Sequence, residues 1–379
     1  MPDGAGATGD PHRVERFLAA LRPSATPDGF VPFDRFMEVA LYGEGVGFYD
    51  RPDSPFGRTG DYYTAALVSP LFGECVAERV LETLRGLGNS FPLRLVELGP
   101  GDGTLGETIV RALGRDADLR GRTEYALVER ARASALRAYE RVSAAAAPGG
   151  VRVTAASGLG ADGPFSGVVL ANEVLDAQPC RRLKWTGVEW LETGVRLGDD
   201  RWVPDERPLT ARVPGAKLPE GVAAGSILEV SPAAEAIARE VGDHLTDGLF
   251  LALDYGMEES ELLAAHPHGT LAAVRQHRSG VDPYAQPGDA DLSVFVNFSR
   301  FRFAAKSAGL RELAFRSQAE ALGEWGFPRL FEEAVRAAPS SEEEVRIRLA
   351  AKNLLFGFER FRALELVPEA SFGKFPSAT

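Results

Sequence analysis

The sequence has few of the residues that build metal centres or disulfide frameworks. Among its 379 residues are two cysteines and five histidines. Cys75 and Cys180 lie far apart in the chain and form no C-x-x-C motif, so they predict neither a zinc site nor a disulfide framework. The histidines have no metal-ligand spacing either, since His266 and His268 flank a proline and His277 stands alone. We therefore expect no bound metal.

Basic residues are outnumbered by acidic ones. The chain has 42 Lys and Arg against 54 Asp and Glu, which gives a formal net charge of −12. Nucleic-acid binding requires clustered Lys and Arg to neutralise phosphates, and no basic stripe occurs along this sequence. We therefore expect no nucleic-acid partner.

Long apolar runs are missing as well. No segment is apolar over the length that a membrane-spanning helix requires. Residues 1–12 are rich in Gly, Ala and Asp and lack the basic start and apolar run of a signal peptide, so we expect a disordered tail. These features together predict a cytoplasmic protein without a membrane partner.

The pattern that is present alternates strand-like and helical runs. Hydrophobic residues make up 45% and charged residues 25% of the chain, as in ordinary globular proteins. Strand-like runs occur at 93–98, 124–129, 151–154, 167–171 and 249–255, and helical runs separate most of them, at 106–113, 131–142 and 232–245. This alternation predicts an α/β fold with a mostly parallel sheet covered by helices on both faces.

The remaining segments predict additions to this core. We expect an N-terminal helical region at 13–92 and a core at 93–260, in which 181–212 has the short alternating runs and turn signals of an antiparallel insertion. Residues 261–355 predict a loop and a helical region on the substrate side. Residues 356–379 predict a closing strand at the edge of the main sheet and a tail.

The most informative motif is Glu97-Leu98-Gly99-Pro100-Gly101-Asp102-Gly103, in which a buried strand ends in a glycine-rich turn before a helix. Such a turn needs positive φ, which glycine tolerates best, and the start of the helix favours an anionic group. The next strand ends in Glu129, farther away than the acid of the dinucleotide-binding pattern. The motif therefore favours a nucleotide-type cofactor other than NAD, with Glu97, the three glycines and Glu129 around it.

Further polar groups follow other strands. Asn172, Glu173 and Asp176 come just after the run 167–171, where ligands bind in open α/β sheets, and a carboxylate there could accept a proton. Asn172 and Asp176 also suit a turn and a helix cap. His277 lies in a long polar loop, where it could act as a general base or could simply be solvated.

These motifs in their order resemble the MidA-type family of S-adenosylmethionine (SAM)-dependent methyltransferases, whose mitochondrial member is a complex I assembly factor that methylates protein arginine. The likeness runs from about Phe33 to Leu366 and includes the blocks 60–64, 97–105, 127–129, 171–179, 229–232 and 254–256. It implies a class I methyltransferase (Rossmann-like) fold with SAM as cofactor. It also implies that Gly60, Asp61 and Thr64 join the glycine loop and Glu129 around SAM.

The sequence departs from the family pattern on the substrate side. After Thr64 the family usually has a proline and an acid, but here the chain continues Ala65-Ala66-Leu67. Losing a carboxylate weakens the case for a guanidinium acceptor, so the acceptor could be a small, secondary-metabolite-like molecule or a protein side chain. A non-methylating step such as cyclisation in small-molecule biosynthesis, a role as an assembly factor and a homodimer also remain open.

Overall fold

The chain divides into two units that alternate along the sequence. In this computed structural model the described residues are 11–51, 69–88, 92–161, 163–210, 212–213, 215, 217–275 and 278–375. Unit 1 comprises residues 1–62, 175–238 and 256–304, and unit 2 comprises 63–174, 239–255 and 305–379. The chain thus crosses five times between the units, and the last three crossings fall inside α7 (Pro232–His244), β10 (Leu245–Met257) and α9 (Phe298–Ser307).

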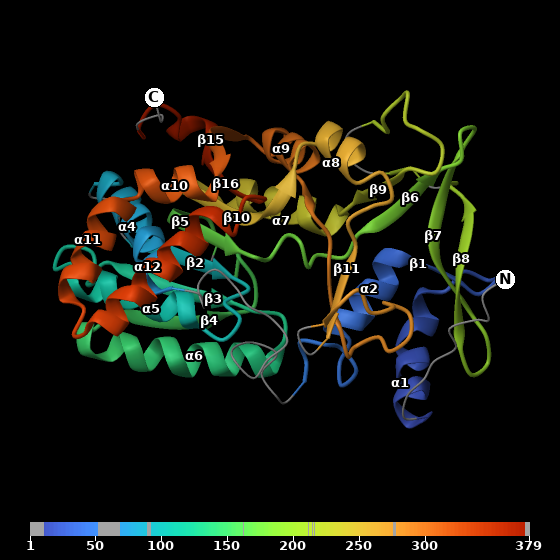
Figure 1. Ribbon diagram of the computed structural model, residues 1–379, viewed down its shortest axis with the longest axis horizontal. Coiled ribbons are helices and arrows are strands. Elements are labelled where there is room, and N and C mark those ends of the chain that lie inside the picture. Colours follow the sequence, from blue (N-terminus) through green and yellow to red (C-terminus); the bar gives the residue numbers. More distant parts are fainter. Residues whose placement is uncertain are drawn as a thin grey trace. The chain divides into compact units, whose positions relative to one another are not determined.

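Unit 2 contains the parallel sheet that the sequence predicts (Figure 1). Its strands follow the order β15-β16-β10-β5-β2-β3-β4, in which β16 runs antiparallel to both of its neighbours and the strands from β10 to β4 pair in parallel. The parallel strands besides β10 are β2 (Leu93–Leu98), β3 (Thr123–Val128), β4 (Arg152–Ala156) and β5 (Phe165–Asn172). The predicted Rossmann-like fold is confirmed.

Three helices of unit 2 pack side by side against this sheet: α4 (Pro70–Gly86), α5 (Thr104–Arg115) and α6 (Arg132–Ala146). Ser69 starts α4 by accepting the N–H of Leu71, and Pro70 occupies the first turn, where a missing N–H costs nothing. The apolar faces of the helices and strands form one core, to which Val80, Ile109 and Leu95 contribute fully buried side chains. This core fixes the carboxyl ends of the strands, where the site residues lie.

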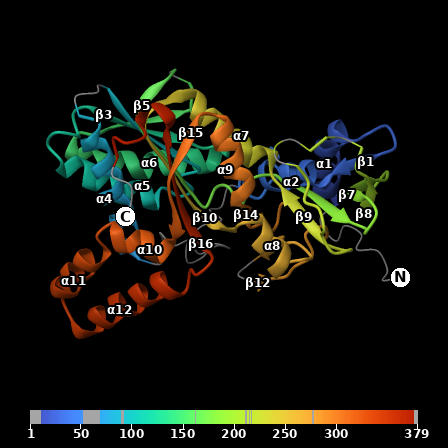
Figure 2. The same ribbon diagram turned by 90° about the horizontal axis from the view of Figure 1, so that it is seen from above.

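The C-terminal part of unit 2 corrects one expectation. The closing strand β16 (Phe361–Pro368) is not at the edge of the sheet, because β15 (Leu310–Ser317) pairs with its outer side. Between these strands lie α10 (Gln318–Glu324), α11 (Phe327–Ala337) and α12 (Ser341–Phe356), and Figure 2 shows α11 and α12 as a hairpin that projects from the sheet. The run at 310–317 was not predicted as a strand, because its half-exposed residues do not alternate cleanly.

Unit 1 is built on antiparallel strands. The expected insertion forms β6 (Arg181–Trp185), β7 (Trp190–Leu197) and β8 (Trp202–Pro208), and its sheet also includes β1 (Phe30–Pro32) and β9 (Ile227–Val230). A smaller sheet joins β11 (Ala272–Arg275), β12 (Arg278–Ser279) and β13 (Asp291–Ser293), and the short β14 (Val296–Asn297) pairs with the end of β10. Among the described residues, the α-helices assigned wholly to this unit are α1 (Pro11–Leu21), α2 (Phe33–Tyr42) and α8 (Glu259–Ala265). Its core packs Phe17, Phe36 and Trp202 together.

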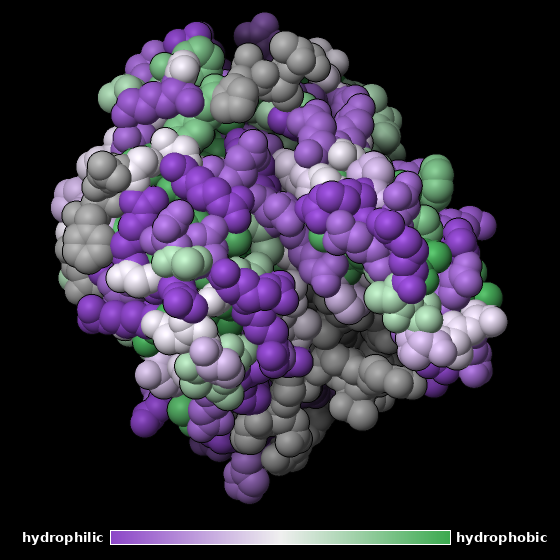
Figure 3. Space-filling model, turned by 90° about the vertical axis from the view of Figure 1, so that its left-hand side faces the viewer, coloured by the Kyte–Doolittle hydropathy of each residue, from purple (hydrophilic) through white to green (hydrophobic). Residues whose placement is uncertain are grey.

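The face of the molecule in Figure 3 is mainly hydrophilic, as expected for a chain with 25% charged residues. In Figure 3 hydrophilic residues cover most of the face shown, and hydrophobic residues are scattered among them. No helix within the described residues is long and apolar enough to cross a membrane. The described residues also contain no group of His, Cys, Asp and Glu that could hold a metal ion.

Candidate functional site

Glycine shapes the turn that follows β2. Gly99, Gly101 and Gly103 all adopt the left-handed conformation, with φ of +58°, +58° and +79°, which other residues rarely tolerate. A Cβ atom on Gly99 would lie 2.9 Å from Cγ2 of Val174, and one on Gly103 would lie 3.1 Å from the backbone of Ala138 on α6. Only glycine therefore lets this loop approach its neighbours so closely before α5 begins.

Asp102 ties the loop to the helices on either side of it. Its Oδ1 accepts the N–H of Thr104 at 3.0 Å, and its Oδ2 lies 2.8 Å from Nη1 of Arg141 on α6. The start of α5 carries a partial positive charge that favours an anionic ligand group. The loop is thus a rigid turn with an electropositive helix end beside it.

The carboxylate of Glu97 lies inside the protein below this loop. Glu97 is 2% exposed, and its Oε2 accepts a hydrogen bond of 2.7 Å from the hydroxyl of Tyr125 on β3. Burial raises the pKa of Glu97 to about 7, the charges of Asp102 and Glu129 act in the same direction, and the Tyr125 hydrogen bond opposes them. A Cβ on Gly106 of α5 would lie only 2.7 Å from Oε2, so α5 covers this carboxylate closely.

Glu129 follows β3 directly and lies beside the glycine loop. Its Oε1 accepts the N–H of Ala131 at 2.9 Å. Burial raises the pKa of Glu129, whereas the backbone N–H groups of Ala131, Arg130 and Gly101 lower it. The structure therefore brings Glu129 and Gly101 together, as the sequence predicts for two parts of one site.

The turn after β5 has an unusual backbone. Glu173 has φ of +54° and is the one non-glycine residue in the described part of the chain with positive φ. Its N–H donates to the carbonyl of Leu253 at 2.9 Å, and the N–H of Val174 donates to Oδ2 of Asp254 at 3.1 Å. Asn172 donates from Nδ2 to Glu173 Oε1 at 3.5 Å, and the buried Oδ1 of Asn172 has no hydrogen-bond partner among the described residues.

Asp176 belongs to unit 1, whereas Asn172 and Glu173 belong to unit 2. Asp176 is buried, and its backbone carbonyl accepts the N–H of Val294 at 3.0 Å. Its charge contributes to raising the pKa of the half-buried Tyr49, for which loss of solvent contact is the main cause and Asp291 the second. The Tyr49 hydroxyl donates to Asp291 at 2.8 Å, so unit 1 groups a phenol with the buried carboxylates Asp176 and Asp291.

Four predicted site residues lie outside the described residues: Gly60, Asp61, Thr64 and His277. Their assignments stay predictions from the sequence.

Two partners at the site were not predicted. Tyr125 sits in the middle of an ordinary apolar strand, and nothing in that run distinguishes it from a core residue. Asp254 lies in the strand-like run predicted at 249–255, but its contact with the turn at 173–174 depends on the parallel pairing of β10 with β5. An acid near the carboxyl end of an apolar run was the one signal available in the sequence.

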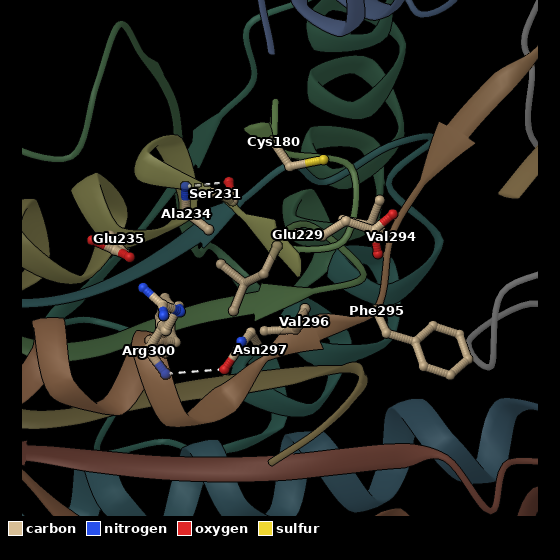
Figure 4. Close-up of a pocket in the computed structure, with 12 residues that line it drawn as sticks. Cys180, Glu229, Ser231, Ala234, Glu235, Val294, Phe295, Val296, Asn297 and Arg300 are labelled. Atoms are coloured by element: carbon tan, nitrogen blue, oxygen red, sulfur yellow. Dashed lines mark hydrogen bonds between the residues drawn. The ribbon is translucent and has the colours of Figure 1, made fainter. Parts of the chain in front are cut away.

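Unit 1 also contains a small cavity of about 20 Å³, lined by residues of β9, α7, β14 and α9 (Figure 4). This volume is enough for about one water molecule. Figure 4 shows Glu235 and Arg300 on the same side of it. The Arg300 guanidinium forms an ion pair with Glu259 and donates to the carbonyl of Lys217 at 3.0 Å. The backbone N–H of Arg300 donates to Oδ1 of Asn297 at 3.2 Å. These bonds hold Arg300 in place beside the cavity and indicate a structural role for it.

The chain is similar to known proteins over most of its length. A family model described as "Putative S-adenosyl-L-methionine-dependent methyltransferase" matches residues 75–316. The mitochondrial protein arginine methyltransferase NDUFAF7 homolog of Drosophila melanogaster is 30% identical over 315 residues, which cover 76% of this chain and 70% of that protein. The human mitochondrial protein arginine methyltransferase NDUFAF7 is 27% identical over 324 residues, covering 77% and 69%.

Two crystal structures from Burkholderia thailandensis share the whole fold. One, bound to S-adenosyl-homocysteine, has a TM-score of 0.83 and 29% identity, and the match covers 96% of this chain and 95% of that one. The other, a native structure, has a TM-score of 0.79 and 30% identity, with 97% of each chain covered.

The expectation of a cytoplasmic location is contradicted by the relatives. The Drosophila, Caenorhabditis elegans and human proteins are all named as mitochondrial. The expectation rested on the absence of a secretory signal pattern, which does not separate the cytoplasm from an organelle.

Proposed function

We propose, from the premise that the chain belongs to the family of S-adenosyl-L-methionine-dependent methyltransferases, that unit 2 holds SAM at the carboxyl ends of β2, β3 and β5. The resemblance to the MidA-type family and the choice of SAM as cofactor are confirmed by the family match and by the relative bound to S-adenosyl-homocysteine. Which residues hold the cofactor, and which acceptor it serves, are the parts that we propose.

The residues present in unit 2 fit SAM. The glycine loop and the start of α5 suit the carboxylate of its methionine part, and the Glu129 carboxylate suits a pair of ribose hydroxyls. The buried Oδ1 of Asn172 has no partner among the described residues, although buried polar atoms are nearly always hydrogen-bonded. This acceptor is the observation that carries the proposal, because a ligand with an amino or ammonium group would satisfy it.

Glu97 acts from below the loop in this proposal. Its carboxylate is held by Tyr125 and covered by Gly106, so it supports the turn. Above its pKa of about 7 it also adds negative charge near the methionine ammonium. Glu173 stands at the open end of β5 beside Asn172, where a carboxylate could accept the proton of an acceptor. For Asp176 in unit 1 and for His277, a role in catalysis remains a proposal from the sequence.

For the acceptor we propose the guanidinium of a protein arginine. When bound, SAM supplies an electrophilic methyl group, and the enzyme must align a nucleophile and remove its proton. The relatives named as protein arginine methyltransferases support this choice. Carboxylates recognise a guanidinium through charge-assisted hydrogen bonds, and Glu173 supplies a carboxylate next to Asn172 in unit 2.

A small-molecule acceptor is the second candidate, because the sequence lacks the family's acid at Leu67. Incubation of the purified full-length protein with methyl-labelled SAM separates the two. One sample receives cell protein and the other a protein-free metabolite extract. Label on protein arginine supports our proposal, and label confined to the metabolite extract overturns it.

The same reactions test whether methyl transfer occurs at all. S-adenosylhomocysteine should form together with the labelled product, and its absence in every reaction would contradict a methyltransferase function. Glu173→Gln should lower the rate if the carboxylate takes part. Glu140→Gln, which changes an exposed carboxylate on α6, is the matched control.

A further inference from the structure

Asp254 lies on β10, beside the end of the neighbouring strand β5. It is fully buried on β10, and in the register of the sheet its neighbour Leu253 lies opposite Asn172 of β5. The Asp254 carboxylate accepts two backbone N–H groups, from Val174 at 3.1 Å and from its own neighbour Tyr255 at 2.8 Å. In both of these hydrogen bonds the donor is a backbone N–H group.

The backbone that Asp254 holds is the turn with the unusual φ. Glu173 has φ of +54°, a conformation that a residue with a side chain keeps only when its surroundings impose it. The N–H groups on both sides of its Cα are fixed by adjacent residues of β10, since Glu173 N–H donates to Leu253 and Val174 N–H donates to Asp254. Leu253 and Asp254 of β10 therefore hold the turn in this conformation.

The 172–174 turn also contacts the glycine loop. Cγ2 of Val174 lies 2.9 Å from the position that a Cβ on Gly99 would take, so the valine side chain packs directly on the loop backbone. A turn that relaxed at Glu173 would carry Val174 away from Gly99 and would swing Asn172 and Glu173 to new directions. One carboxylate thus links the turn after β5 to the loop after β2.

We propose that Asp254 is a positioning residue for the cofactor site. It holds the 172–174 turn in the left-handed conformation in which Val174 supports Gly99 and Asn172 and Glu173 face the cofactor. This role rests on the proposed SAM site in unit 2. It assigns Asp254 no contact with the cofactor or the acceptor.

The test is a mutant cycle read by calorimetric titration of the full-length protein with S-adenosylhomocysteine. Asp254→Ala is made in three backgrounds: wild type, Glu173→Gly and Glu173→Gln. Glycine adopts positive φ without strain, so its turn needs Asp254 less, whereas glutamine keeps the strain and removes only the charge. We expect Asp254→Ala to raise Kd about tenfold in the wild-type and Glu173→Gln backgrounds, and less than about threefold with Glu173→Gly.

An equal loss of affinity in all three backgrounds, or no loss in the wild type, would overturn the positioning role. A purely structural contribution moves the unfolding temperature but does not depend on which residue occupies position 173. Should Asp254→Ala fail to fold, Asp254→Asn enters the same cycle, since it keeps one acceptor oxygen and loses the second. Failure of the wild-type protein to bind S-adenosylhomocysteine would instead refute the proposed SAM site itself.

Discussion

The hydroxyl group of Tyr125 donates a hydrogen bond of 2.7 Å to the carboxylate of Glu97 in the interior of unit 2. Both side chains are buried, and burial raises the pKa of each. Because the pKa of Tyr125 is well above its usual value of 10.0, the phenol stays protonated and remains the donor. The pair joins β2 to β3 directly under the start of α5.

Glu97 should make the stability of the protein fall as the pH rises. Its pKa is about 7 in the folded protein against 4.5 ordinarily, so between these values the folded state holds a proton that the unfolded chain has lost, and higher pH lowers the free energy of unfolding. The contribution is fully present below pH 4.5 and is lost as the pH rises through about 7. We expect a loss of roughly 2 kcal/mol between about pH 5 and about pH 8, measured by urea unfolding.

Glu97→Gln is the informative variant here, because its amide is neutral at both pH values and retains an oxygen for Tyr125. Its stability should change less with pH than that of the wild type, whereas Glu140→Gln should follow the wild-type profile. Parallel pH profiles for the wild type and Glu97→Gln would show that Glu97 does not hold the proton.

Gly106→Ala should destabilise unit 2. The new Cβ would lie 2.7 Å from Glu97 Oε2 and 2.9 Å from Cγ2 of Val142, and overpacking of this kind costs about 1–3 kcal/mol. Gly323→Ala on α10 is the matched control, because no atom lies within 4 Å of its Cβ and alanine favours helix by about 0.5–1 kcal/mol. Opposite signs in denaturant unfolding are expected, and a stabilised Gly106→Ala would contradict the close approach of α5 to Glu97.

Gly101→Val should abolish SAM binding while the fold persists. A β-branched side chain does not tolerate φ of +58°, so the loop would have to change shape. Gly150→Val is the comparison, since Gly150 also has positive φ, at +69°, but has open space around its Cβ. Calorimetric titration with SAM should show lost binding for the first variant and normal binding for the second. Unchanged affinity in Gly101→Val would remove the glycine loop from the site.

The buried ion pair of Arg79 on α4 and Glu365 on β16 should behave as a unit. Nε and Nη2 of Arg79 lie 3.0 and 2.6 Å from Glu365 Oε2, and the two side chains are 7% and 2% exposed. Arg79→Leu leaves a buried carboxylate without its main partner and should cost about 3 kcal/mol, but Arg79→Leu with Glu365→Leu should recover most of this loss. Arg348→Leu breaks an exposed pair on α12 and should cost less than about 1 kcal/mol. Additive losses at the two buried positions would refute the coupling.

The sequence predicted those features of the candidate site that local rules determine. The strand at 93–98, the glycine turn and the acid Glu129 follow from apolar runs, from the freedom of glycine and from strand ends, and the structure brings them together. The contacts between distant segments were not predictable in this way. Tyr125 meets Glu97 only because β3 pairs with β2, and Asp254 reaches Val174 only because β10 pairs with β5.

The strained backbone at Glu173 could not be predicted from the sequence either. Positive φ is normally signalled by glycine or asparagine, and a glutamate in that position gives no warning. The outermost strand β15 was missed for a related reason, since its half-exposed residues lack clear alternation. In both cases the conformation comes from partners far away in the chain.

The five crossings of the chain between the units affect any attempt to produce one unit without the other. Neither unit corresponds to one uninterrupted gene fragment, and three of the crossings fall inside a helix or strand. A single proteolytic cut at any crossing leaves the two units joined by the other four crossings. Unit 2, which carries the glycine loop, could be produced by itself only if its three segments were joined in a new order or with new linkers.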